Sequence, residues 1–147
     1  MPQKATIRRL AHGSPDYDAA VALRRRILRT PLGLDFTPEQ LAAEAADTHL
    51  AAFIDGVIAA TVVLSPYDAT ALKLRQMAVD PALQGQAVGA QLLSAAEDHA
   101  RADGKARIVL SARVTAEGFY ARHGYVRESE VFTEVTIPHV RMAKNLA

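Results

Sequence analysis

The chain has 147 residues, of which 50% are hydrophobic and 22% are charged. This length and composition predict one compact domain spanning residues 1–147, with a core that needs no covalent cross-links. The chain has no cysteine, which excludes a disulfide framework, an iron–sulfur cluster, a thiolate zinc site and a thiol nucleophile. Its 17 basic and 16 acidic residues leave a net charge of +1. The chain therefore lacks the large excess of positive charge that would indicate binding to nucleic acid.

No apolar run approaches the roughly 20 residues that span a bilayer. The amino terminus lacks the apolar stretch of a secretory signal. We therefore expect a cytoplasmic protein with neither a membrane nor a nucleic-acid partner.

The first elements that the sequence predicts are a strand at residues 5–10 and a helix. Ser14 or Asp16 can cap this helix. Apolar residues then recur at helical spacing, and Pro31 and Gly33 end the helix.

The only basic cluster, residues 24–26, falls on this helix. We interpret it as part of a solvent-exposed helix face rather than as a surface that binds phosphates. Arg24 or Arg25 could contact an anionic part of a substrate, but solvation is the preferred interpretation. Thr37 with Gln40 forms a capping-box pattern, which predicts a second helix running to about Asp47.

The rest of the chain predicts an antiparallel meander followed by a parallel crossover. The predicted elements are strands at 49–54, 57–64 and 71–79, a long helix ending near 102, a strand at 107–111, a short helix at 115–122, and strands at 125–132 and 140–144. Short connections favour antiparallel neighbours, whereas the crossover through the long helix favours a parallel one. The fold class is therefore α/β, with a mixed sheet of the α+β kind.

The most informative segment joins the strand at 71–79 to the long helix. It reads Gln84-Gly85-Gln86-Ala87-Val88-Gly89. Glycines let backbone N–H groups approach an anion, and a helix start adds unpaired donors and about half a positive charge. Such a loop suits a pyrophosphate. The P-loop lysine is missing, which argues against a nucleoside triphosphate, and the dinucleotide fingerprint is missing, which argues against a dinucleotide.

This segment resembles the Gln/Arg-x-x-Gly-x-Gly/Ala pattern of the GNAT superfamily of acyl-CoA N-acyltransferases. The superfamily's second signature, Phe-Tyr-x-x-x-Gly-aromatic, falls on residues 119–125, and residues 137–142 are most similar to the ElaA-type branch. The resemblance implies a GNAT-like fold, in which the strands at 71–79 and 107–111 form a parallel pair that splays apart.

The resemblance also implies where acetyl-CoA binds. The pantetheine would pair with the backbone of Met77, Ala78 and Val79, and the pyrophosphate would rest on the loop and helix start. The residues implied for the loop and helix start are Gln84, Gly85, Gln86, Ala87, Val88, Gly89 and Ala90. Ala87 stands where a glycine is usual, so we expect it to have a negative φ that tolerates the methyl group.

Tyr120 matches the family tyrosine that binds the cosubstrate and protonates the CoA sulfur, and a phenol titrating near 10 holds a proton at neutral pH. Phe119 is interpreted as packing. The resemblance places an oxyanion donor at the backbone N–H near Val79. Without a cysteine, direct attack by the amine through a tetrahedral intermediate is the simpler mechanism.

The general base is left open by the sequence. Lys73 and Ile108 stand where many relatives carry an acidic residue. His139 is the first candidate because imidazole titrates near neutrality. Glu117, Glu134 and a chain of water molecules are the alternatives.

The sequence thus predicts an N-acetyltransferase that moves an acetyl group from acetyl-CoA to a primary amine on a small molecule or a protein. The alternative is a non-catalytic acyl-CoA-binding or regulatory module on the same fold. We expect no metal, because the other histidines show no convergent spacing with carboxylates. A homodimer is possible, since dimers are common in the superfamily.

Overall fold

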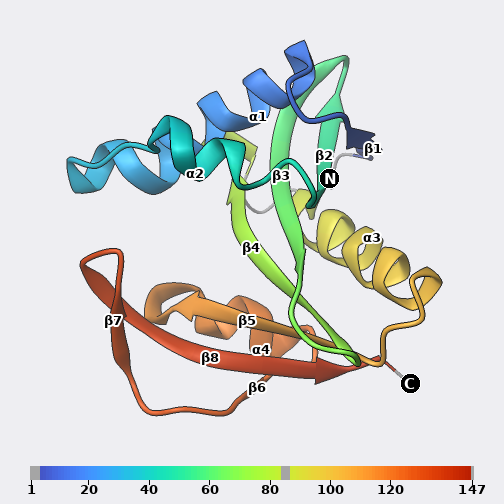
Figure 1. Cartoon of the computed structure of the whole chain (residues 1–147), viewed down its shortest axis with the longest axis vertical. Helices are drawn as coiled ribbons and strands as arrows, with labels where there is room; N and C mark the ends of the chain where they lie inside the picture. The colour runs from blue at the N-terminus through green and yellow to red at the C-terminus, as the bar shows by residue number, and fades with distance from the viewer. Residues whose placement is uncertain (1–3, 84–86, 147) are drawn as a thin grey trace.

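The computed structural model describes residues 4–83 and 87–146, and an open mixed sheet runs through them (Figure 1). The strands are β1 (Thr6–Leu10), β2 (Thr48–Ile54), β3 (Val57–Pro66), β4 (Ala71–Val79), β5 (Arg107–Arg113), β6 (Val126–Arg127), β7 (Phe132–Glu134) and β8 (Ile137–Asn145). Their order is β1-β2-β3-β4-β5-β8-β6, with β7 paired to β8. The β4–β5 pair is parallel and the other pairs are antiparallel, which confirms the predicted mixed sheet.

Helices cover both faces of this sheet. They are α1 (Pro15–Arg24), η1 (Arg25–Arg29), η2 (Thr30–Leu32), α2 (Pro38–Ala42), η3 (Pro81–Leu83), α3 (Val88–Ala102), η4 (Val114–Ala116) and α4 (Glu117–Arg122). Ala20 of α1 packs on Ala51 and Phe53 of β2, whereas α3 packs on the opposite face, against Leu50 and Val62. Among these described helices, none is long and apolar enough to cross a membrane.

Two predicted helix starts are confirmed, and one predicted helix end is wrong. The Ser14 hydroxyl accepts the N–H of Tyr17 at 3.1 Å, and Thr37 and Gln40 form the reciprocal capping box. However, α2 ends at Ala42 rather than near Asp47. The next turns close through shorter-range bonds, such as Glu44 N–H to Leu41 O at 3.1 Å, and they turn Glu44 toward α1.

The strand predicted at 125–132 is also wrong in its extent. The structure divides this region into β6 and β7, which pair with different parts of β8. Residues 128–131 separate the two short strands and are polar apart from Val131. The N–H of Glu128 still donates to the carbonyl oxygen of Arg141 at 2.7 Å, but residues 129–131 have no register with β8. The strands β6 and β7 are therefore short edge strands on β8.

The parallel pair separates partway along its length. Pairing runs from Ala71↔Arg107 to Leu74↔Leu110 and then stops, although both strands continue. On its other side, β4 keeps pairing with β3 through an irregularity at Gln76, whose φ is +55°. This confirms the predicted splayed pair, and Figure 1 shows β4 and β5 running in different directions beyond the paired end.

The prediction that Arg24 is solvated is wrong. Its side chain is 1% exposed, and it donates to both carboxylate oxygens of Glu44, at 2.8 and 2.6 Å. The hydroxyl of Tyr17 donates to the same carboxylate at 2.9 Å. Arg24 follows the buried residues Ala20 and Val21 by four and three positions, which places it on the buried face of α1. By contrast, Arg25 and Arg26 lie at the surface, as predicted.

The charges in this buried pair perturb one another. Burial raises the pKa of the Glu44 carboxyl, but the hydrogen bonds and charge of Arg24 outweigh it, so that the pKa is lower than usual. Burial and the hydrogen bond to Glu44 raise the pKa of Tyr17 to about 12. Glu44 is therefore ionised in the folded protein and joins α1 to the turn after α2.

We predict that Glu44→Gln lowers the free energy of unfolding by about 3–5 kcal/mol at pH 7, because it leaves Arg24 buried without a counter-charge. Glu39→Gln, on the exposed side of α2, is the matched control and should change it by less than about 0.5 kcal/mol. The pKa of Glu44 is lower in the folded protein than in the unfolded chain. The stabilisation of the fold by ionised Glu44 is therefore complete above the ordinary carboxyl pKa, and it is lost as the pH falls toward the pKa in the folded protein. Urea unfolding at several pH values should show the variant and the wild type converging in acid. Equal losses for the two variants at pH 7 would contradict this role.

Candidate active site

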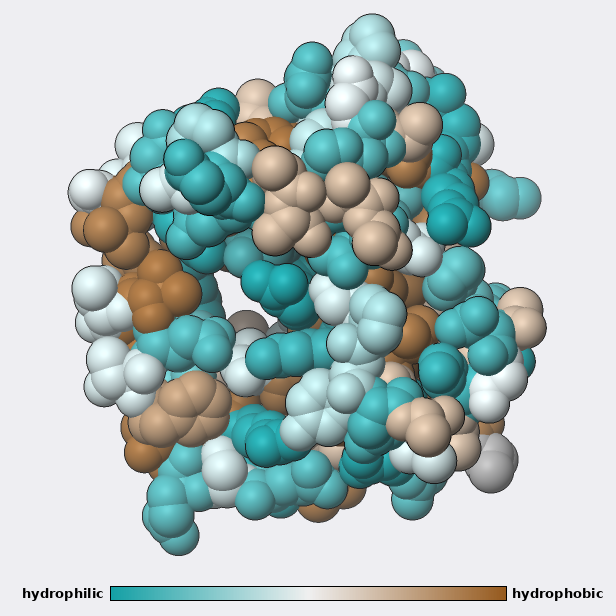
Figure 2. All heavy atoms as spheres, viewed as in Figure 1, coloured by the Kyte–Doolittle hydropathy of each residue, from teal (hydrophilic) through white to brown (hydrophobic). Residues whose placement is uncertain are grey.

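A cavity of about 610 Å³ lies where β4 and β5 separate. Its walls come from β3, β4, β5, η1, α2, α4 and the turn between β7 and β8. Figure 2 shows an opening on this face of the molecule, between the part that carries α1 and α2 and the part that carries β7 and β8, with hydrophilic residues around much of its rim. The volume is typical of a site for a small ligand.

Tyr120 of α4 reaches the cavity at the point of separation. Its side chain is 8% exposed, and its hydroxyl donates to the sulfur of Met77 at 3.5 Å, a weak hydrogen bond. Burial raises the pKa of the Tyr120 phenol, so the group keeps its proton at neutral pH. A protonated hydroxyl beside the unpaired part of β4 could donate to an atom that enters between the strands.

Phe119 does not line the cavity. It packs on the start of α3 instead: a side chain at Gly89 would meet the Phe119 ring at 3.4 Å and Val79 at 3.4 Å. This packing, which agrees with its interpretation from sequence, joins α4 to the start of α3. The two sequence signatures therefore meet in space.

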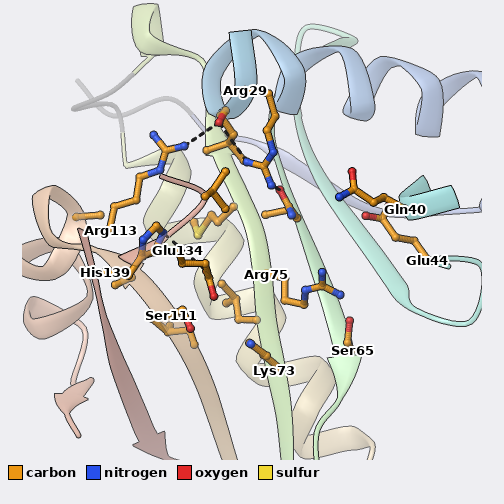
Figure 3. A pocket seen from close by; sticks show the side chains of 18 of the residues that line it. Arg29, Gln40, Glu44, Ser65, Lys73, Arg75, Ser111, Arg113, Glu134 and His139 are labelled. Carbon is orange, nitrogen blue, oxygen red and sulfur yellow. Dashed lines mark hydrogen bonds and ion pairs between the residues drawn. The ribbon is translucent and has the colours of Figure 1, made fainter. Parts of the chain in front are cut away.

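His139 of β8 lies in the same cavity with a defined tautomer. Its Nδ1 is 2.9 Å from the carbonyl oxygen of Ile137, which can only accept, so Nδ1 carries a proton. In the neutral ring Nε2 is then the unprotonated nitrogen. Nε2 lies 3.8 Å from the carboxylate of Glu134, which would stabilise a positive charge on the ring. Figure 3 shows both side chains pointing into the cavity.

The other candidate bases are placed differently. Glu134 lines the cavity beside His139, whereas Glu117 lies outside it and accepts two hydrogen bonds from Arg127, at 2.9 and 3.0 Å. Lys73 lines the cavity wall, and Ile108 is buried in the core under α3. Among the acidic candidates, the structure brings only Glu134 to the site.

The start of α3 differs from the expectation for one residue. Ala87, the N-cap residue, has a φ of +64°, so the predicted negative φ is wrong. At this position the chain turns sharply into the helix, and the left-handed conformation costs an alanine about 1–2 kcal/mol. Val88, Gly89 and Ala90 follow as the first helical residues, whose N–H groups have no acceptor within a helix. Gln84, Gly85 and Gln86 lie outside the described residues.

The remaining predicted contacts lie along β4. Met77 lines the cavity, and Ala78 and Val79 pair with Thr61 and Ala60 of β3. Since the pairing with β5 ends at Leu74, the opposite edge of these three residues has no strand partner within the described part of the chain. Their backbone groups on that edge are available to a ligand.

Sequence reasoning missed the positive charge of the cavity. Arg29, Lys73, Arg75 and Arg113 all line it (Figure 3). A signal was present in the alternation of β4, where Lys73 and Arg75 interleave with the core residues Leu72 and Leu74. No local pattern could show that Arg29 and Arg113 meet them.

A parallel strand pair that separates within an open mixed sheet is the arrangement of the acyl-CoA N-acyltransferase fold. Residues 32–146 match the acetyltransferase (GNAT) domain family, and the chain belongs to this family.

Solved structures agree on the fold. An acyl-CoA N-acyltransferase from Pseudomonas aeruginosa has a TM-score of 0.79 at 23% identity, over 96% of this chain and 99% of that one. Escherichia coli ElaA has a TM-score of 0.80 at 21% identity, over 96% and 99%. A GNAT family acetyltransferase from Elizabethkingia anophelis with acetyl-CoA bound has a TM-score of 0.73 at 19% identity, over 96% and 97%. The predicted resemblance to the GNAT superfamily is confirmed.

The conformation of Ala87 gives a stability prediction. Ala87→Gly should raise the free energy of unfolding by up to about 1 kcal/mol, because glycine adopts a positive φ without steric cost. Ala95→Gly, in the middle of α3, is the control and should lower it by about 1 kcal/mol. Urea unfolding of the two variants measures both effects. Similar losses in both would show that the positive φ of Ala87 carries no penalty.

Proposed function

We propose that the protein is an N-acetyltransferase that moves an acetyl group from acetyl-CoA to a primary amine. The observation that carries this proposal is the separation of β4 from β5 beside Tyr120, whose hydroxyl lies 3.5 Å from the Met77 sulfur on the unpaired edge. The acetyl-CoA bound to the Elizabethkingia anophelis relative supports acetyl-CoA as the donor.

The described residues fit acetyl-CoA at two places. The unpaired edge of Met77, Ala78 and Val79 offers backbone groups for the pantetheine amides. The first-turn amides of α3 offer donors and the positive end of the helix dipole for the pyrophosphate. The loop residues Gln84, Gly85 and Gln86 complete this second place in our proposal, and acetyl-CoA supplies the thioester acetyl group.

The proposed transfer needs no covalent enzyme intermediate. The amine nitrogen attacks the thioester carbonyl carbon, a C–N bond forms, and the C–S bond breaks. The proton lost by the amine passes to Nε2 of His139, and the departing sulfur takes the proton of Tyr120. The products are an N-acetyl amide and free CoA. The backbone N–H near Val79 is our proposed donor to the oxyanion.

Three features support His139 as the base. Its tautomer leaves Nε2 free to accept a proton, its side chain lines the cavity, and Glu134 lies close enough to stabilise the imidazolium. His139 of β8 pairs with Arg113 at the end of β5. This end of β5 lies beyond Leu110, where the pairing of β5 with β4 stops. Glu134 acts in this proposal through His139 rather than on the substrate.

Tyr120→Phe should lower kcat at least tenfold and leave the affinity for acetyl-CoA nearly unchanged, because it removes only the proton donor. Tyr67→Phe, a tyrosine outside the cavity, is the control and should retain full activity. The measurements are CoA release with an amine panel and the melting temperature with acetyl-CoA. Ligand at a hundredfold excess over Kd should stabilise the protein by about 2.7 kcal/mol.

The same experiment separates the two functions considered. Stabilisation by acetyl-CoA without CoA release from any amine would favour the acyl-CoA-binding module over the enzyme. An absence of stabilisation would contradict both. Turnover in the wild type that Tyr120→Phe leaves unchanged would remove the tyrosine from the mechanism.

His139→Gln should lower kcat about a hundredfold, within the usual contribution of a general base. Glu134→Gln should have a smaller effect, because it removes only the stabilisation of the imidazolium. His99→Gln, on α3 and outside the cavity, is the matched control. Steady-state kinetics of the three variants, each checked for an unchanged melting temperature, measure this order. Full activity in His139→Gln would assign the base elsewhere.

We further propose that residues 1–147 act as one domain, in the cytoplasm, on a small-molecule or protein amine. A homodimer is part of this proposal, and its measurement is the mass of the protein in solution.

A further inference from the structure

The cavity holds four cationic side chains that lack a carboxylate partner. Arg29, Lys73, Arg75 and Arg113 form no ion pair within 4.0 Å of any described acidic residue. The guanidinium of Arg25, outside the cavity, has such a partner in Asp35, at 2.6 Å. Four cations without a carboxylate partner therefore line one cavity.

The carboxylates that line the cavity neutralise only part of this charge. Glu44 is held by the buried Arg24, at 2.8 and 2.6 Å. Glu134 lies 3.8 Å from His139, and its charge also acts on Arg29. The cavity therefore presents an excess of positive charge to whatever enters it.

Two of the arginines are held in place by backbone and ring contacts. Arg29 and Arg113 both donate to the carbonyl oxygen of Leu28, at 3.1 and 2.9 Å, and the Arg29 guanidinium lies 4.6 Å from the centre of the Phe36 ring. Figure 3 shows these two arginines converging from η1 and β5, with Arg75 below them on β4. The cluster is built by three elements that are distant in the sequence.

The arginines repel one another in this arrangement. Burial lowers the pKa of Arg29, and the charges of Arg113 and Arg24 lower it further, while the charge of Glu134 opposes them in part. Burial alone lowers the pKa of Arg113. An anion placed among these groups would offset both the repulsion and the lost hydration, so the site favours an anionic ligand.

The position of the cluster assigns this anion to the acceptor rather than to acetyl-CoA. Lys73 and Arg75 alternate along β4 with Leu72 and Leu74, which pack in the core under α3. The cations therefore lie on the sheet face opposite α3. None of the described residues of α3 lines the cavity, so the helix start proposed for the pyrophosphate lies elsewhere.

We infer that the acceptor is a small primary amine that also carries an oxyanion, a carboxylate or a phosphonate, which Arg29, Arg75 and Arg113 bind. This inference rests on the proposed acetyltransferase function. Planar guanidinium groups match both oxyanions and can bind them through paired hydrogen bonds. The Ser65 hydroxyl, which is buried in the cavity wall and has no hydrogen-bond partner, offers one further polar group to the ligand.

A matched panel of amines tests this inference. Each set has one alkyl chain length, from two to six carbons, with the amine at one end and a methyl, carboxylate or phosphonate group at the other. We expect kcat/KM for one anionic series to exceed that of the methyl series at least tenfold at the best length, and the better anion identifies the ligand chemistry. Equal or better acetylation of the methyl series would overturn the inference and leave the acetyltransferase function intact. No acetylation of any amine would count against the function itself.

Arg75→Gln tests the cluster directly. Arg75 is exposed and its side chain makes no hydrogen bond or ion pair with a described residue, so removing the guanidinium should not affect folding. We expect KM for the best anionic amine to rise about tenfold and KM for the methyl amine to change much less, with the KM for acetyl-CoA unchanged. Arg75→Lys should recover part of the loss, because it restores the charge without the paired donors.

The matched control is Arg9→Gln, which removes an equal charge from an exposed position on β1, outside the cavity. It should leave the KM for the anionic amine unchanged. An equal rise in both variants would assign the effect to net charge, and a rise in the KM for acetyl-CoA in Arg75→Gln would assign the arginine to the cosubstrate. Either result overturns the inference.

Discussion

Backbone hydrogen bonding between β4 and β5 stops at the pair Leu74–Leu110, and the functional part of the molecule depends on that stop. A parallel pair that closed fully would satisfy its own N–H and C=O groups and leave no cavity. The irregularity at Gln76 lets β4 stay paired with β3 while it turns away from β5. The opened edge is a consequence of this separation, and the phenol of Tyr120 and the charged wall opposite α3 line the cavity that it leaves.

Much of the fold follows from local patterns. The caps at Ser14 and Thr37, the short antiparallel connection between β2 and β3, and the crossover through α3 each depend on residues close together in the sequence. Such features need no knowledge of tertiary contacts, which is why the sequence predicts them. The placement of Tyr120 in the site also came from a short motif.

The features that the sequence did not predict depend on partners far along the chain. The helical spacing places Arg24 on the buried face of α1, but only Glu44, 20 positions away, supplies the counter-charge that lets an arginine be buried there. At Ala87 the sequence suggested a negative φ, but the entry into α3 imposes a positive one that local propensity disfavours. The cavity arginines come from η1, β4 and β5, and no spacing rule joins these three elements.

The charge of the cavity also bears on how an amine loses its proton. An ammonium group that enters beside Arg29, Lys73 and Arg75 meets like charges, which favour its neutral form and lower its pKa. In the proposed mechanism the wall shares the deprotonation of the amine with His139, which is consistent with a lysine, rather than an acidic residue, on this part of β4. The oxyanion inferred for the acceptor would supply the attraction that holds the molecule against this repulsion. In that proposal, one set of cations binds one end of the substrate and activates the other.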